Sequence, residues 1–204
     1  MHSVHIAPYP PIRTPNIQVV EGALSPEQCK TLRDLGEEMF NHHGVIPGRV
    51  GFNDMSRVDR YRRVVDSQWL PWPWEDERMM WVYEAMSEII QQVNARVWQV
   101  DVTDWVDKFH YLRYRKGGHF RFHQDAGDGW RKAERKLAFS LLLSNLDEYE
   151  GGDLQYFDAE PISLKRLKLG DMAVFHSHLQ HQVTKVTKGV RRSLVGWASG
   201  PKWK

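Results

Sequence analysis

The sequence has little cysteine and no long apolar run. Cys29 is the one cysteine among 204 residues, so this chain alone can form neither an intramolecular disulfide nor a thiolate metal cluster. No apolar stretch approaches the roughly 20 residues that cross a bilayer. The first residues also lack the charged start and apolar stretch of a secretory signal. We therefore expect no membrane association and a reducing, cytoplasmic location.

A strong charge of one sign is also missing. Lys and Arg number 28 against 26 Asp and Glu, which gives a net charge of +2. That excess is too small to indicate a nucleic acid or a membrane surface as a partner. Apolar residues make up 41% and charged residues 26%, the ordinary balance of a globular protein. We predict one domain over residues 1–204, which is long enough to bury a sizeable core.

What the sequence does contain begins with two amphipathic helical patterns. Ser25 is suited to cap the first helix, because Pro26 follows at the first helical position and Gln28 stands three residues on. Apolar residues then recur at helical spacing as far as residue 40, and again from residue 75 to residue 98. We predict helices over 26–40 and 75–98.

The segment between these helices, 42–74, has no clear periodicity. It holds an arginine cluster and three tryptophans: Arg57, Arg60, Arg62, Arg63, Trp69, Trp72 and Trp74. We predict a long loop with one strand near 62–65, and loops of this length are usually functional or disordered. Two interpretations stay open: a lid or peptide groove over a site, or tryptophans that seal the helices against a sheet.

After Val100 the sequence changes to short strand patterns separated by Gly and Asp turns. The predicted strands cover 109–114, 119–125, 136–145, 154–157, 172–175, 182–186 and 193–197, and one more, 17–20, precedes the first helix. Such spacing indicates a β-sandwich or barrel. Helices followed by strands give an α+β order, with helical support and loop over 1–100 and a β core over 101–204.

A candidate metal site begins with His123 and Asp125. Side chains two apart on a strand face the same way, so both could reach one ion. With one further histidine they form the two-histidine, one-carboxylate face that leaves positions open on non-haem iron(II). A lone His-x-Asp is weak support, because a surface histidine beside a solvated acid has the same pattern. Spacing alone leaves three candidates for the second histidine: His176, His178 and His181.

The C-terminal third resembles the prolyl 4-hydroxylase-like branch of the Fe(II)- and 2-oxoglutarate-dependent dioxygenases. That branch has a Gly-Asp pair, then an apolar strand, then the distal histidine. A Val follows five residues after that histidine, a Gly eight residues after it and a basic residue ten residues after it. Only His181 gives this register, and the matching residues are Gly170, Asp171, Val186, Gly189, Arg191 and Trp197. The likeness continues upstream and covers about residues 105–198, through Tyr114, Gly117, Phe120, 141–145 and 150–154.

The resemblance implies a double-stranded β-helix, or jelly roll, with N-terminal supporting helices. It implies that His123, Asp125 and His181 bind Fe(II) and that Arg191 binds the far carboxylate of 2-oxoglutarate, since guanidinium grips carboxylate with two parallel hydrogen bonds. Tyr114 would add a hydrogen bond to the co-substrate or simply pack in the barrel wall. The implied reaction consumes O₂, hydroxylates a C–H bond and releases succinate and CO₂, with ascorbate as a reductant for the iron.

Two neighbouring positions carry smaller expectations. Arg192, next to Arg191, should point to the opposite face of its strand, toward solvent. Some relatives place a tyrosine on the third strand to help hold the far carboxylate. Leu143 stands at the matching position here, so this contact must come from elsewhere.

The substrate is less defined than the metal site. The resemblance favours a peptidyl residue such as proline, or an amino-acid-like small molecule, and Trp130 and Arg131 are candidate substrate contacts. Two rival classes remain. A zinc- or manganese-dependent hydrolase could use the same three ligands but would not need Arg191. A non-catalytic β-sandwich binding module would need no metal.

Overall fold

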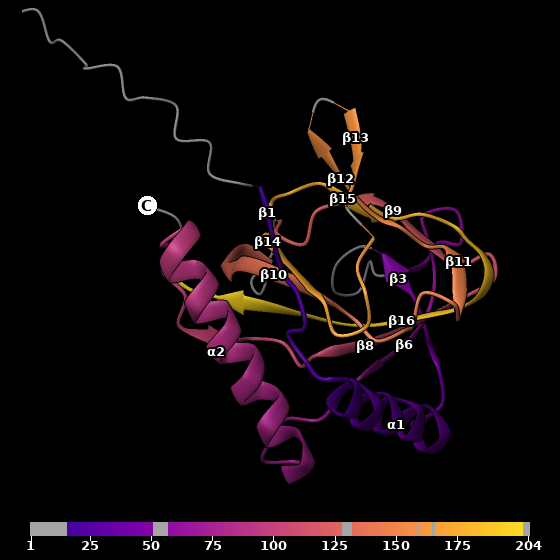
Figure 1. Cartoon of the computed structure of the whole chain (residues 1–204), viewed down its shortest axis with the longest axis horizontal. Helices are drawn as coiled ribbons and strands as arrows, with labels where there is room; N and C mark the ends of the chain where they lie inside the picture. The colour runs from indigo at the N-terminus through magenta and orange to yellow at the C-terminus, as the bar shows by residue number, and fades with distance from the viewer. Residues whose placement is uncertain (1–15, 51–56, 128–131, 159, 165, 202–204) are drawn as a thin grey trace, which may run out of the picture.

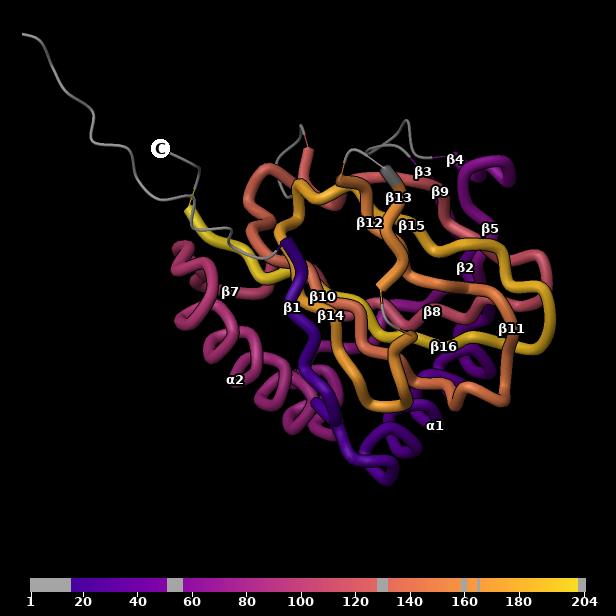
Figure 2. The backbone as a smooth tube through the Cα atoms, turned by 45° about the horizontal axis from the view of Figure 1, so that its top comes forward, coloured from indigo at the N-terminus to yellow at the C-terminus, as the bar shows by residue number. Residues whose placement is uncertain are grey.

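The computed structural model of the chain describes residues 16–50, 57–127, 132–158, 160–164 and 166–201. Two β-sheets face each other, and two helices lie against the outside of one of them (Figures 1 and 2). All the strand pairs are antiparallel.

The large sheet has nine strands in the described part of the chain, in the path order β1-β14-β10-β16-β8-β6-β2, with β7 and β11 also paired to β16. In that order they are β1 (Ile17–Val20), β14 (Met172–His176), β10 (Arg135–Leu142), β16 (Val186–Ser199), β8 (His110–Arg115), β6 (Asp66–Trp69), β2 (Ile46–Pro47), β7 (Asp104–Trp105) and β11 (Tyr149–Gly151). The long strand β16 therefore forms the centre of this sheet.

The small sheet faces the large one and, within the described ranges, has five strands in the order β13-β12-β15-β9-β5. They are β13 (Glu160–Ser163), β12 (Leu154–Asp158), β15 (His181–Val183), β9 (His119–His123) and β5 (Arg63–Val64). A separate short pair is formed by β3 (Arg49–Val50) and β4 (Arg57–Val58). Two opposed antiparallel sheets of this kind form a double-stranded β-helix, so the predicted α+β jelly-roll class is confirmed.

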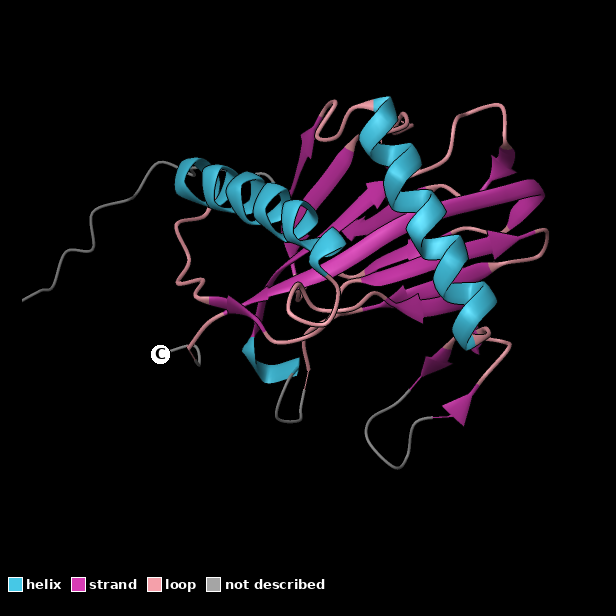
Figure 3. Ribbon diagram, turned by 90° about the horizontal axis from the view of Figure 1, so that it is seen from below, coloured by secondary structure: helices cyan, strands magenta, loops and turns pink. Residues whose placement is uncertain are grey.

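Both helices cover the outer face of the large sheet (Figure 3). Helix α1 (Pro26–His43) begins with the predicted capping box, in which the Ser25 hydroxyl accepts from the Gln28 backbone and the Gln28 side chain accepts from the Ser25 backbone. Helix α2 (Met80–Val97) follows a short 3₁₀ turn, η2 (Glu77–Met79). In the ranges that the structure covers, neither helix is long and apolar enough to cross a membrane.

Strand β10 explains why the core has two apolar layers. Leu137 and Leu141 pack in the layer under the helices, whereas Ala138 and Leu142 pack between the two sheets. Side chains alternate along a strand, so a strand covered on both faces is apolar at nearly every position. The inner layer is the one that surrounds the candidate site.

The long loop expected over 42–74 is wrong in one respect. The segment contains several short strands, and β5 lies where the single strand was predicted. Strand β6 joins the large sheet beside β8, with Trp69 opposite His110. These strands are two to four residues long, so they carry too little periodicity to be recognised, and their pairing with distant strands defines them.

Candidate active site

The site lies in a cavity of about 610 Å³ between the two sheets. Alternate residues of two neighbouring strands provide much of its wall. On β8 these are His110, Leu112 and Tyr114, and their partners on β16 are Val195, Ser193 and Arg191. Because paired residues of antiparallel strands project to the same face, this register sends all six side chains toward the interior.

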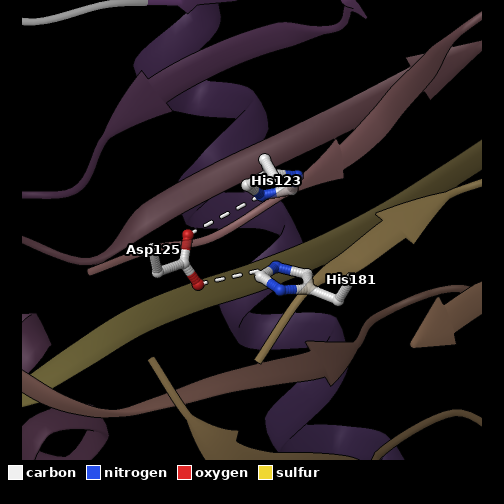
Figure 4. Close-up of side chains that lie close together, drawn as sticks. All are labelled: His123, Asp125 and His181. Carbon is white, nitrogen blue, oxygen red and sulfur yellow. Dashed lines mark ion pairs between the residues drawn. The ribbon is translucent and has the colours of Figure 1, made fainter. Parts of the chain in front are cut away.

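Three potential metal ligands converge at the cavity (Figure 4). His123 ends β9, His181 begins β15, and the two residues are paired across the strands. The ligand atoms of His123, Asp125 and His181 lie within 4.8 Å of one another. The Asp125 carboxylate is 3.7 Å from His123 Nε2 and 3.5 Å from His181 Nε2. The structure thus brings together the three residues that the sequence pattern selected.

Regular strand alternation does not produce this convergence. Strand β9 has an irregularity, because Phe120 pairs with Val183 and His123 with His181, three residues against two. The rings of Phe120 and His123 therefore stack on one face, with centroids 3.5 Å apart. Asp125 lies beyond the end of the strand, where its backbone N–H donates to the Ser177 carbonyl at 2.9 Å. A bulge and a turn replace the alternation argued from the sequence.

The backbone also selects which nitrogen of each imidazole faces the site. His123 Nδ1 lies 2.9 Å from the Arg121 carbonyl, and His181 Nδ1 lies 2.9 Å from the Leu179 carbonyl. A carbonyl only accepts, so each contact requires a proton on Nδ1. Each Nε2 is left unprotonated toward Asp125, which is the tautomer that a metal-ligating histidine needs.

The charge states of His123 and Asp125 agree with metal binding. Burial, with His181 nearby, lowers the pKa of His123 to about 3. Burial raises the pKa of Asp125, but His181, His123 and Arg135 outweigh it and hold that pKa below its ordinary value. At neutral pH His123 is therefore a neutral imidazole and Asp125 an ionised carboxylate, the forms in which such side chains bind a divalent metal. Two nitrogens and one carboxylate suit iron(II) with open positions.

Arg191 is a buried cation without an acidic partner among the residues that the structure describes. Only 2% of the residue is exposed. Its Nη1 donates to Ser193 Oγ at 3.1 Å, while in the described residues its Nε has no hydrogen-bond partner. No carboxylate of those residues lies within ion-pair distance of it. A buried charge left in this way calls for an anionic ligand.

Arg191 sits deeper than the large cavity. Tyr114 lines that cavity, whereas Arg191 lines a small neighbouring one and lies 5.7 Å from the Tyr114 ring. Gly152 makes room for it, since a Cβ there would stand 2.9 Å from Arg191 Cδ. Tyr114 is fully buried, and burial raises the pKa of its phenol, so this hydroxyl stays a proton donor at neutral pH.

The expectation that Arg192 faces solvent is wrong. Its side chain does leave on the face opposite Arg191, but helix α1 covers that face. Arg192 Nε donates to Glu37 at 2.7 Å, and its backbone N–H donates to Ser144 at 2.8 Å. Strand alternation predicts the face to which the side chain points, but it does not predict that a helix covers this face.

The position assigned to Leu143 also needs correction. Leu143 packs in the layer under the helices, away from Arg191. The β10 residue that lines the small cavity with Arg191 is Leu142. Since Leu142 is also apolar, β10 offers no polar contact to a ligand of Arg191 at this position.

The remaining candidate residues fall away from the three ligands. His176 packs edge-on against Trp98, and His178 is exposed. Trp72 stacks on Trp74 on the side of the helices, whereas Trp69 lines the cavity. The sequence predictions for Trp130 and Arg131 lie outside the described residues.

Sequence reasoning missed Arg135, which begins β10. Its guanidinium donates to Asp107 at 2.6 Å, lies 3.8 Å from the Trp197 ring, and donates from Nη1 to the backbone carbonyl of Asp125 at 3.2 Å. This side chain fixes the turn that carries Asp125. An arginine at the start of an apolar strand was the one available signal.

Comparison with known sequences agrees with this geometry. Residues 109–199 match the profile of the family described as the 2OG-Fe(II) oxygenase superfamily. A PKHD-type hydroxylase of Idiomarina loihiensis is 36% identical over 118 residues, which cover 56% of this chain and 53% of that protein. Another, of Maricaulis maris, is 40% identical over 86 residues, or 42% of this chain and 38% of that protein. The chain thus spans about half, or less, of the length of these relatives.

Solved structures share the fold at low sequence identity. A Pseudomonas putida prolyl-4-hydroxylase has a TM-score of 0.72 at 21% identity, covering 90% of this chain and 92% of its own. A prolyl hydroxylase from Trichoplax adhaerens, in complex with a peptide fragment of the hypoxia inducible factor oxygen degradation domain, has a TM-score of 0.74 at 13% identity, covering 91% and 84%. These matches extend over the helices as well as the β core.

Proposed function

We propose that this chain, a prolyl hydroxylase-like member of the 2OG-Fe(II) oxygenase superfamily, hydroxylates an unactivated C–H bond and couples this to conversion of 2-oxoglutarate to succinate and CO₂. One observation carries the proposal. A two-histidine, one-carboxylate cluster occupies the same barrel as a buried arginine that has no acidic partner within the described ranges. The cluster alone would suit several metals, and the arginine adds the need for an anionic co-substrate.

In this proposal His123, Asp125 and His181 hold iron(II), and Arg191 binds the far carboxylate of 2-oxoglutarate. Bound iron and 2-oxoglutarate would supply the activation of O₂, with ascorbate to return oxidised iron to iron(II). The Arg191 guanidinium can donate two parallel hydrogen bonds to the carboxylate, while Ser193 keeps it oriented. The aromatic wall of Tyr114, Phe175 and Trp197 excludes water from the reacting groups.

For the substrate we propose a peptidyl residue such as proline, or an amino-acid-like small molecule. Support comes from structural neighbours that are prolyl hydroxylases, one of them bound to a peptide fragment. The cavity is also large enough for a side chain and its flanking backbone. Trp69, which is partly exposed at the cavity wall, offers a flat apolar surface for such a group.

The test is succinate release by protein reconstituted with iron(II), 2-oxoglutarate and ascorbate without O₂, before and after O₂ is admitted. We expect a violet iron–2-oxoglutarate charge-transfer band before O₂, then slow oxygen-dependent succinate release even without substrate. A band that never forms, together with hydrolytic activity of the zinc-loaded protein, would favour the hydrolase. Absence of metal binding would favour the non-catalytic module.

Substitution of the ligands tests their assignment. His123→Ala, Asp125→Ala and His181→Ala should each abolish the band and succinate release while far-UV circular dichroism stays unchanged, because each removes one of three ligands. His178→Ala is the matched control, since His178 is exposed and should keep both signals. Loss of the band in His178→Ala with retention in His181→Ala would reverse the assignment.

A further inference from the structure

Positive charge is concentrated on the wall of the large cavity. In the described part of the chain, its lining includes six cationic side chains and one carboxylate, that of Asp125. The six are Arg49, Arg62, Arg63, Arg121, Lys132 and Arg135. Arg135 is already neutralised by Asp107, and Asp125 belongs to the metal cluster. Among the described residues, no carboxylate lies within ion-pair distance of Arg62, Arg63 or Arg121, and of these three only Arg63 is partly buried.

Loading the site does not remove this excess. The charges of iron(II), 2-oxoglutarate, the Asp125 carboxylate and the Arg191 guanidinium sum to zero. The co-substrate therefore brings no spare negative charge to the rest of the cavity. Arg63 is partly buried, and a positive charge shielded from water attracts an anion more strongly than a charge in solvent does.

Among these side chains, Arg63 is linked to a candidate metal ligand through one aromatic ring. It lies on β5, where it pairs with Phe120 of β9, and its guanidinium is 4.4 Å from the Phe120 ring centroid. That ring stacks on His123. A single aromatic ring thus separates the guanidinium from a metal ligand, which places any group bound to Arg63 beside the reacting centre.

The hydrogen-bonding capacity of Arg63 is only partly used. Its Nη1 donates to the Arg49 carbonyl at 3.2 Å. Its Nε is buried without a partner in the described residues, and none of their carboxylates lies within ion-pair distance. Burial lowers the pKa of Arg63, although Tyr114 and Asp125 raise it. The planar guanidinium therefore keeps donors for a planar carboxylate.

The facing wall is aromatic and uncharged. His110 stacks on Trp69 with ring centroids 4.0 Å apart, and Trp197 lies 6.2 Å from Trp69. Burial, with Arg63 and Arg135 nearby, lowers the pKa of His110 well below its ordinary value, so the imidazole is neutral. Its Nε2 is also buried without a hydrogen-bond partner in the described part of the chain. The cavity is therefore polarised, with a cationic side at Arg63 and a neutral side at His110.

We propose that the substrate carries a carboxylate that pairs with Arg63 inside the cavity, which makes Arg63 a specificity-determining residue. This inference rests on the proposed function and narrows its substrate class. The carboxylate can belong to a free amino-acid-like acid or to an acidic side chain beside the reacting residue of a peptide. The neutral aromatic side then holds the remainder of the substrate.

The test uses protein loaded with zinc(II) and 2-oxoglutarate, which occupies the Arg191 site and does not turn over. Two matched pairs of probes are titrated and followed by the fluorescence of the cavity tryptophans. The first pair is N-acetyl-L-proline and N-acetyl-L-prolinamide. The second is the blocked peptide Gly-Glu-Pro-Glu-Gly and its Gln counterpart. We expect the carboxylate member of at least one pair to bind about tenfold more tightly, as one charge-assisted contact predicts.

Variants assign the preference to Arg63. In Arg63→Gln the binding ratio within the pair should fall to about one, and Arg63→Lys should restore part of it by returning the charge. Arg96→Gln is the control, because Arg96 is exposed on α2 far from the cavity lining, and it should keep the wild-type ratio. Preference in the first pair alone identifies a free acid, and preference in the second alone identifies an acidic peptide.

Several results would overturn the inference. Equal binding within both pairs, or no saturable binding by any probe, would remove the preference for a carboxylate. A ratio that survives in Arg63→Gln, with 2-oxoglutarate binding weakened instead, would assign Arg63 to the co-substrate. The anaerobic charge-transfer band and oxygen-dependent succinate release are measured on the same preparations. If both signals are present and the carboxylate probes bind no more tightly than the neutral ones, only this inference is overturned. If both signals are missing, the proposed function has failed.

Discussion

At the scale of single residues, contacts with the protein's own backbone prepare the candidate site. The two histidines each bond through Nδ1 to a carbonyl two residues earlier in the chain, so local strand geometry orients their Nε2 atoms. Asp125 is held by its backbone, through Ser177 and Arg135. The three groups are therefore positioned before any metal arrives, which reduces the ordering cost of binding.

The proposed role of Arg191 in binding 2-oxoglutarate can be tested by substitution. Arg191→Met should weaken 2-oxoglutarate binding by about 100-fold or more, since each of the two hydrogen bonds to the charged carboxylate contributes about 1.5–3 kcal/mol. The measurement is anaerobic titration of the charge-transfer band with 2-oxoglutarate, with iron affinity determined in parallel. Iron affinity should change little, because Arg191 does not contact the three ligands. Unchanged 2-oxoglutarate affinity in Arg191→Met would mean that another cation binds the co-substrate, and Arg63 would be the first to examine.

At the scale of elements, helix α1 is tied to the large sheet by one acidic side chain. Glu37 accepts from Arg192 Nε at 2.7 Å and from the Tyr111 hydroxyl at 3.2 Å, and it forms an ion pair with Arg113. Burial raises the pKa of Glu37, but Arg192 and Arg113 outweigh it and lower that pKa from its ordinary value of 4.5.

Glu37→Gln should lower the free energy of unfolding by about 1–3 kcal/mol at neutral pH, because it removes one of the two carboxylates that pair with each of the partly buried Arg113 and Arg192. A lowered carboxyl pKa stabilises the fold above the ordinary value and loses that contribution as pH falls through the folded value. The difference in unfolding free energy between wild type and variant should therefore become smaller below pH 4.5. Urea unfolding across this range measures it. Glu84→Gln, at an exposed position of α2, is the control, and a gap independent of pH would contradict the assignment.

The part of β16 that precedes Arg191 depends on glycine. Gly189 has φ +70°, and a Cβ there would lie 1.9 Å from the Glu148 carbonyl oxygen. Gly189→Ala should therefore lose more than about 2 kcal/mol of unfolding free energy, from the left-handed backbone cost and a clash with backbone. Gly22→Ala provides the comparison, because Gly22 has φ +60° with nothing within 4 Å of the added Cβ. It should cost only about 1–2 kcal/mol. Equal losses in the two variants, measured by urea unfolding, would contradict the clash.

Helices and strands that depend on local sequence could be predicted, whereas those that depend on pairing with distant strands could not. Helix α1 was predictable because the Ser25 capping box is encoded within four residues, and β1 was predicted with the bounds that the structure shows. Strands β5 and β6 are made by pairing with β9 and β8, a tertiary effect that a short window does not contain. The bulge in β9 and the cover of α1 over Arg192 also depend on distant residues. That 1–204 forms one domain stays a prediction.

The candidate site was more predictable than the fold around it. The interval from His181 to Arg191 spans two strands that are consecutive in the chain, β15 and β16, with one short connection between them, so it can be recognised from sequence spacing. Arg63 and His110 could not be recognised in the same way. Arg63 reaches the cavity from a two-residue strand, and His110 from the first position of β8. Neither has a fixed offset from the metal ligands.

At the scale of the whole molecule, ligand binding should be linked to stability. The three candidate metal ligands come from β9, from the turn after it and from β15, so a bound ion connects segments far apart in the chain. Zinc(II) and 2-oxoglutarate should raise the unfolding free energy by about 2.7 kcal/mol at a hundred times the dissociation constant. Thermal unfolding with and without ligands measures this gain. Asp125→Ala should lose the gain, and an equal rise in that variant would indicate binding elsewhere.

The length of β16 limits the mutations that its coding sequence can accept. Its 14 residues pair with four other strands. Its inward positions from Arg191 to Trp197, two residues apart, line the small cavity, line the large cavity and contact Arg135. One inserted codon between those positions would turn every later side chain to the opposite face. Substitutions can alter this stretch one residue at a time, whereas in-frame insertions and deletions of single codons would be purged from it.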